Sequence, residues 1–439
     1  MNNVPNVEKK IGIDLYTTKT PGIGGTLRQQ TEDFGVIEIT NREEGAEGKY
    51  LIVELTKRNW ETHHLIRDLT RILRISQKRI GFAGTKDKRA VTTQKISIYD
   101  VDEEEVQNVH LKDTELKILG RSNKGLELGD LTGNEFIITV RDIDIDENEL
   151  ESRLSQTTAS IKEQGGVPNF FGIQRFGALR PITHVVGESI VRNDIEKAAL
   201  AYIAASYPDE PEDTQQVRDR VFETRNYIEG LKEYPLQLRY ERAMMHHLVS
   251  SPEDYAGSFE TLPANIRKMF VHAYQSYIYN TIICARIKKG LPLNRAVVGD
   301  IVCFKNKAGL PDNSRNERVT EDNIDGMNNL VRRNRAFITA PLIGHSSELA
   351  SGVPGEIERE VIEELNVPIE GFKVPSMEEL SSKGLRREIL LSADPKYTIG
   401  EDELNEGKYK VTLDFSLPKG SYATTILREY MKVEPLKMS

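Results

Sequence analysis

One carboxylate stands within a short stretch of small and basic residues, GFAGTKDKRAVTTQ at positions 81–94. Asp87 lies between Lys86 and Lys88 and is followed by Arg89. Nearby cations favour the ionised form of an acid, and they also attract phosphates. An ionised carboxylate in such a surface suits a nucleophile that acts on nucleic acid. The plainer alternative is a solvated ion pair, because surface pairs are common and weak.

The basic character extends well beyond this turn. Residues 57–95 contain eleven Lys and Arg against three Asp and Glu, whereas the whole chain has a net charge of −9. Acidic residues cluster elsewhere, at 100–105, 142–151 and 209–213. This uneven distribution favours an RNA groove leading to Asp87, although a solvated basic helix face would also account for it.

The segment around Asp87 resembles a motif of the TruD family, the tRNA pseudouridine synthases D. Four further segments resemble the family's motifs in the same order along nearly the whole chain: RQQTEDFGVIE at 28–38, GRSNKG with GDLTGN at 120–134, PNFFGIQRFG at 168–177, and LPKGSYAT at 417–424. Five ordered matches identify a family far more specifically than one motif does.

The resemblance implies an α+β fold. Members have a pseudouridine-synthase catalytic domain with a mixed sheet, interrupted by a large inserted TRUD domain. Carried over to this chain, residues 1–167 form the first part of the catalytic domain, residues 168–386 the insertion, and residues 387–439 the C-terminal part of the catalytic domain.

The resemblance also implies an activity, the isomerisation of uridine to pseudouridine, with uridine 13 of tRNA as the family's site. The reaction breaks the bond from ribose to N1 of uracil, rotates the base and joins the ribose to C5. No atom is lost and no redox change occurs, so we expect no metal and no other cofactor. The expected partner is tRNA, with no protein partner implied and a monomeric chain. The alternative is a noncatalytic RNA-binding protein on the same fold. A methyltransferase is disfavoured because no convincing methyl-donor loop is present.

Roles for the polar site residues follow from the same motifs. Asp87 is the expected nucleophile, and Arg28 matches the position of a basic residue that pairs with the catalytic Asp. Asn169 is expected to contact uracil or to support its loop. Gln94 could order the loop around Asp87 or be structural. Lys86, Lys88 and Arg89 are expected to bind the RNA.

Three aromatic residues are expected to receive the target base, which must leave its stack. By resemblance, Phe171 packs on the flipped base, and Phe34 and Tyr422 help to line the pocket. A stacked aromatic ring contributes roughly 1–3 kcal/mol per base. Taken singly, each of these aromatic residues would more often belong to a hydrophobic core.

The elements that must position these residues can be read from the hydrophobic pattern. Alternation predicts strands at 50–55, 94–99, 135–141 and 409–415, the last after a turn at 405–407. Apolar residues at helical spacing predict an amphipathic helix over about 61–73. Residues 190–289 read as largely helical, with one buried stripe formed by Met269, Tyr274, Tyr277, Ile278 and Ile282.

The rest of the composition excludes several classes of protein. The two cysteines, Cys284 and Cys303, have no paired spacing, which argues against a disulfide framework or a cysteine zinc site. Residues 1–20 are polar and no apolar run approaches the length of a membrane span, so we expect a cytoplasmic protein. The basic run RRNR at 332–335 could contact RNA or be solvated.

Overall fold

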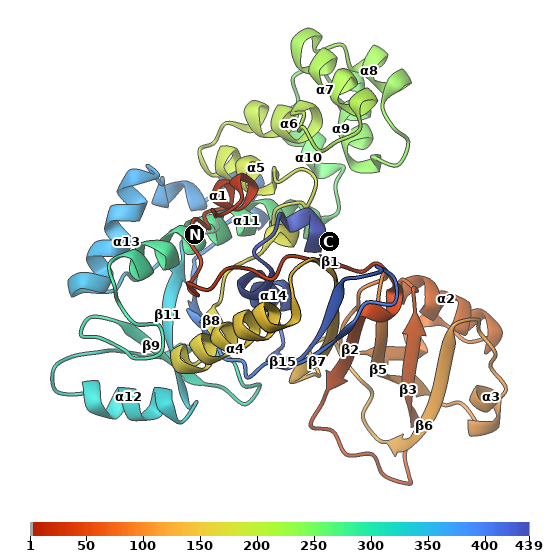
Figure 1. Cartoon of the computed structure of the whole chain (residues 1–439). Coiled ribbons are helices and arrows are strands. Elements are labelled where there is room, and N and C mark those ends of the chain that lie inside the picture. Colours follow the sequence, from red (N-terminus) through yellow and green to blue (C-terminus); the bar gives the residue numbers. More distant parts are fainter. Residues whose placement is uncertain (1–2, 439) are drawn as a thin grey trace.

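The computed structural model describes residues 3–438, and its fold is α+β, as predicted (Figure 1). A nine-stranded mixed sheet has the order β14-β15-β7-β2-β5-β3-β6, with β1 on β7 and β4 on β5. Only β2 and β5 pair in parallel among these strands. The strands are β1 (Thr26–Leu27), β2 (Phe34–Ile39), β3 (Tyr50–Arg58), β4 (Ile80–Phe82), β5 (Val91–Tyr99), β6 (Thr114–Ser122), β7 (Gly133–Ile143), β14 (Lys396–Glu401) and β15 (Tyr409–Pro418).

All four predicted strands are present, as parts of β3, β5, β7 and β15. The alternation of β7 buries Phe136, Ile138 and Val140 but leaves Ile137 exposed. These side chains join a core with α4 (Glu147–Gln164) and α14 (Ala423–Met431). The turn before β15 is also present, with Gly407 at a positive φ of 75°.

The predicted amphipathic helix is α2 (Thr62–Ile72). Its apolar stripe, which includes Leu65, Ile66 and Leu69, is buried in a second core against β3 and β5. A shorter helix, α3 (Glu103–Gln107), lies beside β6. The chain between α2 and β5 contains β4 and the loop with Asp87, so the helix and the sheet together hold that loop.

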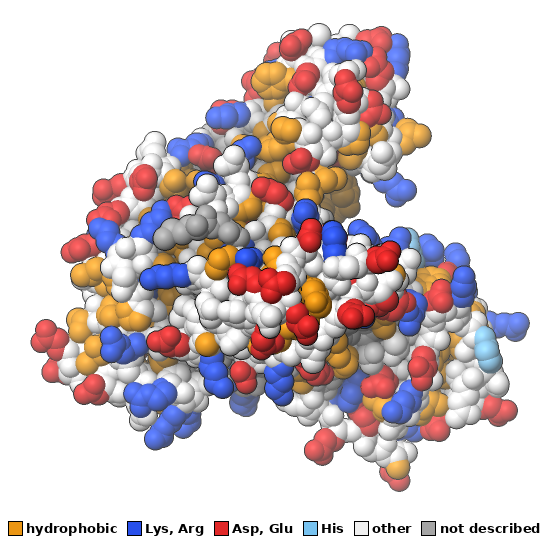
Figure 2. Space-filling model, viewed as in Figure 1, with side chains coloured by type: hydrophobic (Ala, Val, Ile, Leu, Met, Phe, Trp, Pro, Cys, Tyr) orange, Lys and Arg blue, Asp and Glu red, His pale blue; other side chains and the backbone are white. Residues whose placement is uncertain are grey.

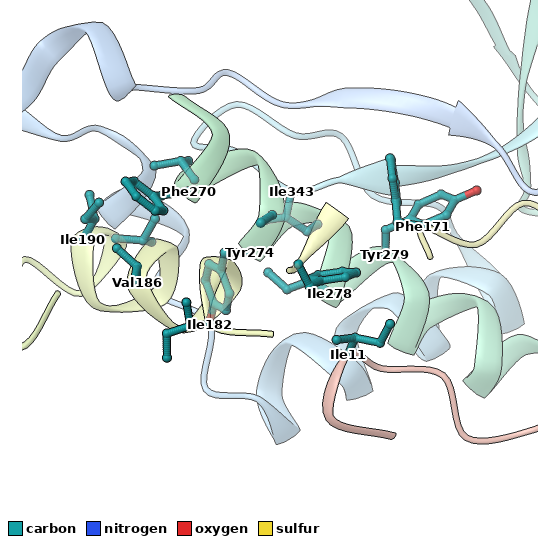
Figure 3. Close-up of a cluster of buried hydrophobic side chains, with 14 of the residues drawn as sticks. Ile11, Phe171, Ile182, Val186, Ile190, Phe270, Tyr274, Ile278, Tyr279 and Ile343 are labelled. Carbon is teal, nitrogen blue, oxygen red and sulfur yellow. The ribbon is translucent and has the colours of Figure 1, made fainter. Parts of the chain in front are cut away.

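The helical region predicted at 190–289 is confirmed (Figure 1). It comprises α5 (Thr183–Val191), α6 (Ile195–Ala204), α7 (Glu212–Thr224), α8 (Tyr227–Glu233), α9 (Arg239–Ser250), α10 (Tyr255–Glu260) and α11 (Ala264–Lys288). Helix α11 crosses the largest core, with Tyr274 and Ile278 buried against α5 (Figure 3). The predicted stripe is buried only in part, because Met269 and Tyr277 are half-buried.

A four-stranded sheet of order β10-β9-β11-β12 completes this half of the molecule. Its elements are β9 (Ile301–Lys305), β10 (Pro311–Arg318), β11 (Ala336–Leu342) and β12 (Leu385–Glu388), together with α12 (Ile324–Arg332) and α13 (Gly352–Glu364). Short strands β8 (Val167–Pro168) and β13 (Leu390–Leu391) pair with each other, so the two chain passages between the halves lie side by side. The domain division at 167/168 and 386/387 remains our proposal.

The packing of the N-terminal residues does not follow this division, because they contact the helical half. Helix α1 (Asn6–Lys10) leads into Ile11 and Ile13, which are buried in the core of the helical half. The Asn280 side chain of α11 donates a hydrogen bond to the Ile11 carbonyl at 3.0 Å. Both cysteines are buried and unpaired. Within residues 3–438, no helix has the length and apolar content that a membrane span requires.

Candidate active site

The structure brings Asp87, in the loop before β5, together with Arg28. Arg28 follows β1 with a left-handed φ of 59°, and its Nη2 atom donates to Asp87 Oδ2 at 2.9 Å. The Asp87 side chain is 56% exposed, whereas that of Arg28 is 17% exposed. A charge-assisted hydrogen bond therefore orients a carboxylate that is still open to solvent.

Arg28 is itself held by two neighbours. Its guanidinium lies 4.0 Å from the centroid of the Phe34 ring, a cation–π arrangement. Arg89 donates to the Arg28 carbonyl at 3.1 Å. Burial lowers the pKa of Arg28, and Asp87 opposes that shift. Phe34 is buried beneath Arg28, so it supports the Arg28–Asp87 pair from the core side.

Lys57 fixes the backbone of the Asp87 loop from within the protein. Its fully buried ammonium donates to the carbonyls of Asp87 at 2.8 Å and Trp60 at 2.7 Å. Burial lowers the pKa of Lys57 to about 8, although Asp87 and Glu61 oppose the shift. Gln94 adds a second anchor, donating to the Gly84 carbonyl at 3.1 Å. Gln94 thus orders this loop, one of the two roles considered from the sequence.

The basic surface is smaller than the sequence count suggests. Lys86 does not face solvent, because its ammonium forms a nearly buried ion pair with Glu38 at 2.6 Å. This placement does not support the expected contact between Lys86 and RNA. Lys57, Arg79 and Lys95 are also not exposed, which leaves seven exposed basic residues: Arg58, Arg67, Arg71, Arg74, Lys78, Lys88 and Arg89. Lys and Arg side chains lie along the edge above α2, which borders the hollow below the α6–α10 lobe (Figure 2).

A second group of predicted residues gathers where the two halves of the chain meet. Asn169 is buried, donates to the Glu388 carbonyl at 3.1 Å and accepts from Arg387 Nη2 at 2.8 Å. The Arg387 guanidinium lies 4.4 Å from the centroid of the Phe171 ring. Asn169 therefore supports the loop, and its two polar atoms hold β12 and Arg387.

Phe171 is 6% exposed and is packed on both sides. The Tyr279 ring meets it edge-on at 5.5 Å, and both rings belong to the core around α11 (Figure 3). Tyr422 lies half-buried just before α14, beside Arg175. Burial lowers the pKa of Arg175, while Tyr422 opposes that shift and Arg387 adds to it. This packing leaves little of the Phe171 ring open, so it does not support the expected stacking of Phe171 on the flipped base.

A line of hydrogen bonds joins the two groups. The Gly129 amide donates to the Ala83 carbonyl at 2.8 Å, and the Lys419 ammonium donates to the Gly129 carbonyl at 2.8 Å. The next residue, Gly420, accepts from Arg387 Nη2 at 3.4 Å. All five sequence motifs therefore converge on one region, because the loop that follows β15 bridges the Asp87 loop and the Asn169 segment.

Some residues of this site could not be expected from the sequence. Arg387 follows no motif, and Tyr279 is one aromatic residue among several in α11. In the sequence, Lys57 stands out only as one of the basic residues at 57–95. Among residues 3–438, no three His, Cys, Asp or Glu side chains come together as metal ligands would.

The chain is similar to known proteins over its whole length. A family model described as "tRNA pseudouridine synthase D (TruD)" matches residues 10–430. Relatives named "Probable tRNA pseudouridine synthase D" are 93% identical in Methanococcoides burtonii over all of both chains, and 62% identical in Methanosarcina acetivorans over 99% of both. A crystal structure of a protein of that description from Methanosarcina mazei has a TM-score of 0.92 and 63% identity, over 99% of this chain and 100% of the other.

Proposed function

The chain belongs to the tRNA pseudouridine synthase D family, and from this premise we propose that it isomerises uridine 13 of tRNA with Asp87 as the nucleophile. At the level of the family, it is an isomerase that converts uridine in tRNA. One observation carries the finer proposal: an exposed carboxylate in a basic loop is oriented by a mostly buried arginine at 2.9 Å. The noncatalytic alternative gives no reason for that pair.

The chemistry requires one ionised carboxylate. Asp87 can attack the sugar or the base, or assist removal of a proton from the sugar; each route begins from the anion. Arg28 donates to Asp87 Oδ2 at 2.9 Å and so orients the carboxylate. The net reaction exchanges a C1′–N1 bond for a C1′–C5 bond, with one proton leaving C5 and one joining N1.

The half-buried Tyr422 ring, which lies beside Arg175, supports binding of the flipped base. Tyr422 is the one of the three predicted aromatic residues that is not buried, since Phe34 and Phe171 are 3% and 6% exposed.

The proposal is tested with an unmodified tRNA transcript. We expect the purified protein to form pseudouridine at position 13 in sodium chloride buffer with a chelator and no added cofactor. Chemical labelling maps the product, and a transcript with cytidine at position 13 is the control. Absence of product with every tRNA tested would favour the noncatalytic RNA-binding alternative. Pseudouridine at another position would support the enzyme activity but contradict uridine 13 as its target.

A second test concerns the Lys57 anchor. Lys57→Met removes the hydrogen bonds to the Asp87 and Trp60 carbonyls while preserving the length of the side chain. We expect the single-turnover rate to fall about tenfold to a hundredfold, because small misplacements of a reacting group cost this much. The Kd for tRNA should change little, since the ammonium is buried.

Lys95→Met is the matched control for Lys57→Met. Lys95 lies on the adjacent strand β5, and its ammonium pairs with Glu44 at 2.8 Å. It makes no contact with the Asp87 loop among the described residues, so its loss should leave the rate within about twofold. Equal rates for the two variants would show that the buried Lys57 anchor is not needed for catalysis.

A further inference from the structure

A large groove lies on the helical half of the molecule and was not expected from the motifs. It encloses about 790 Å³ between α12, β9, β11 and the segments 292–295 and 390–392. We call it the α12 groove. Its lining combines three cationic side chains, Arg295, Lys305 and Arg332, with a single acid, Glu388. A concave surface of this size and charge is suited to an anionic ligand.

The cations of the α12 groove are exposed and unpaired. Arg295, Lys305 and Arg332 are exposed, as are the neighbouring Lys307, Arg333 and Arg335. Within residues 3–438, none of these six lies within 4.0 Å of a carboxylate oxygen, although ion pairs are frequent in the rest of the protein. Six unpaired cations in a chain of net charge −9 repel one another, and a bound polyanion would relieve that repulsion.

The floor of the groove is apolar. Leu310, Val331, Phe337 and Leu390 line it and are half-buried. A floor with an aromatic ring below a rim of Lys and Arg is the arrangement that suits nucleic acid, in which flat bases and phosphates alternate. A compact inorganic anion would not need the apolar area.

Two chain segments connect the groove with the candidate active site. Pro418 lines it, and the loop that follows, with Lys419 and Gly420, bridges the Asp87 loop and Arg387. Glu388 also lines it and is adjacent to Arg387 in β12. These shared segments suit one polymer that contacts both the candidate active site and the groove.

We propose that the α12 groove binds the sugar–phosphate backbone of tRNA at a point away from the target uridine. This assignment rests on the proposed function for the identity of the RNA. It gives the basic run at 332–335 a role as an RNA contact. Lys and Arg side chains gather over this part of the molecule, near α12 (Figure 2).

The test compares two triple variants of equal charge change. The groove variant is R295Q/K305Q/R332Q. The control is K232Q/K289Q/K373Q, whose lysines are exposed but each paired with a neighbouring Glu. The Kd for unmodified tRNA is measured from about 50 to about 200 mM sodium chloride, and the single-turnover rate is measured at saturating RNA.

We expect the groove variant to bind tRNA about tenfold more weakly, or worse, than the control at low salt. Its plot of log affinity against log salt should be flatter by about 2–3, since each lost phosphate contact removes about 0.7–0.9 from the slope. The rate at saturating RNA should stay within about twofold of the wild type, because no reacting group is changed.

Two results would overturn the proposal. Equal affinity and salt slope for the two triple variants would show that the groove does not bind RNA. An equal loss of affinity for a short hairpin that carries only the target uridine would show that the groove is not a remote contact. A third outcome separates the two proposals. If the groove variant loses affinity for tRNA but the wild-type protein forms no pseudouridine, the groove is an RNA-binding site and the proposed function is rejected.

Discussion

Asp87→Asn is expected to abolish turnover while leaving the protein folded and able to bind tRNA. The amide is nearly isosteric and keeps an oxygen that can accept from Arg28, now 2.9 Å from Oδ2, but it carries no charge and is not a competent nucleophile. Loss of a nucleophile commonly costs about 10⁴-fold or more in rate. The side chain is 56% exposed, so we expect the free energy of unfolding to change by no more than about 0.5 kcal/mol.

Asp68→Asn is the matched control for Asp87→Asn. Asp68 lies on α2 within the same basic region, is 31% exposed, and pairs with Arg71 at 3.3 Å. Its replacement causes the same change in charge but touches no proposed reacting group. Turnover and the thermal midpoint are measured on the same sample of each variant. A folded Asp87→Asn protein with near-normal turnover would reject Asp87 as the nucleophile, and a large fall in its midpoint would indicate a structural role.

Local pattern accounts for the elements that the sequence could predict. Strands β3, β5, β7 and β15 bury one face over most of their length, so their alternation is visible without knowledge of the fold. Helix α2 has one apolar stripe for the same reason. The stripe of α11 was predicted less well, because this helix is buried on most sides and its pattern no longer distinguishes the core from a half-covered face.

The residues of the candidate site also fall into two groups, those that the sequence predicts and those that only the fold reveals. The motifs contain Asp87, Arg28 and Asn169, and the structure brings each beside its partners. The buried positions of Lys57 and Lys86 could not be inferred, since their partners depend on how β3, β2 and the Asp87 loop are packed. Arg387 lies more than two hundred residues from Asn169, and only the pairing of β8 with β13 brings them together.

A buried ionic cluster connects the two ends of the chain beside this site. Arg428 of α14 is 5% exposed and donates to Glu8 at 2.8 and 2.9 Å and to Glu429 at 3.0 Å. Thr18 also donates to Glu429, from its amide at 2.9 Å. The cluster holds residues 8–18 against α14, which begins directly after Tyr422. The stability of this cluster therefore affects the position of the loop that bridges the two halves of the site.

Arg428→Met is expected to lower the free energy of unfolding by about 3–5 kcal/mol, because it leaves buried carboxylates without their cation. Burial already raises the pKa of Glu8, and Arg428 opposes that effect. In the variant the pKa of Glu8 should rise further, so the folded state takes up a proton more readily than the unfolded state. The deficit relative to the wild type should therefore be largest at about pH 8 and should shrink toward about pH 5.

Thermal and denaturant unfolding of four proteins test this expectation: the wild type, Arg428→Met, the double variant Glu8→Gln/Arg428→Met, and Lys289→Met. The double variant should recover part of the loss, since one buried charge is removed with its partner. Lys289→Met breaks a surface pair with Glu360 in which both side chains are more than half exposed, so its effect should be within about 1 kcal/mol. A deficit for Arg428→Met that does not depend on pH would show that lost packing, and not unpaired buried charge, is what destabilises the protein.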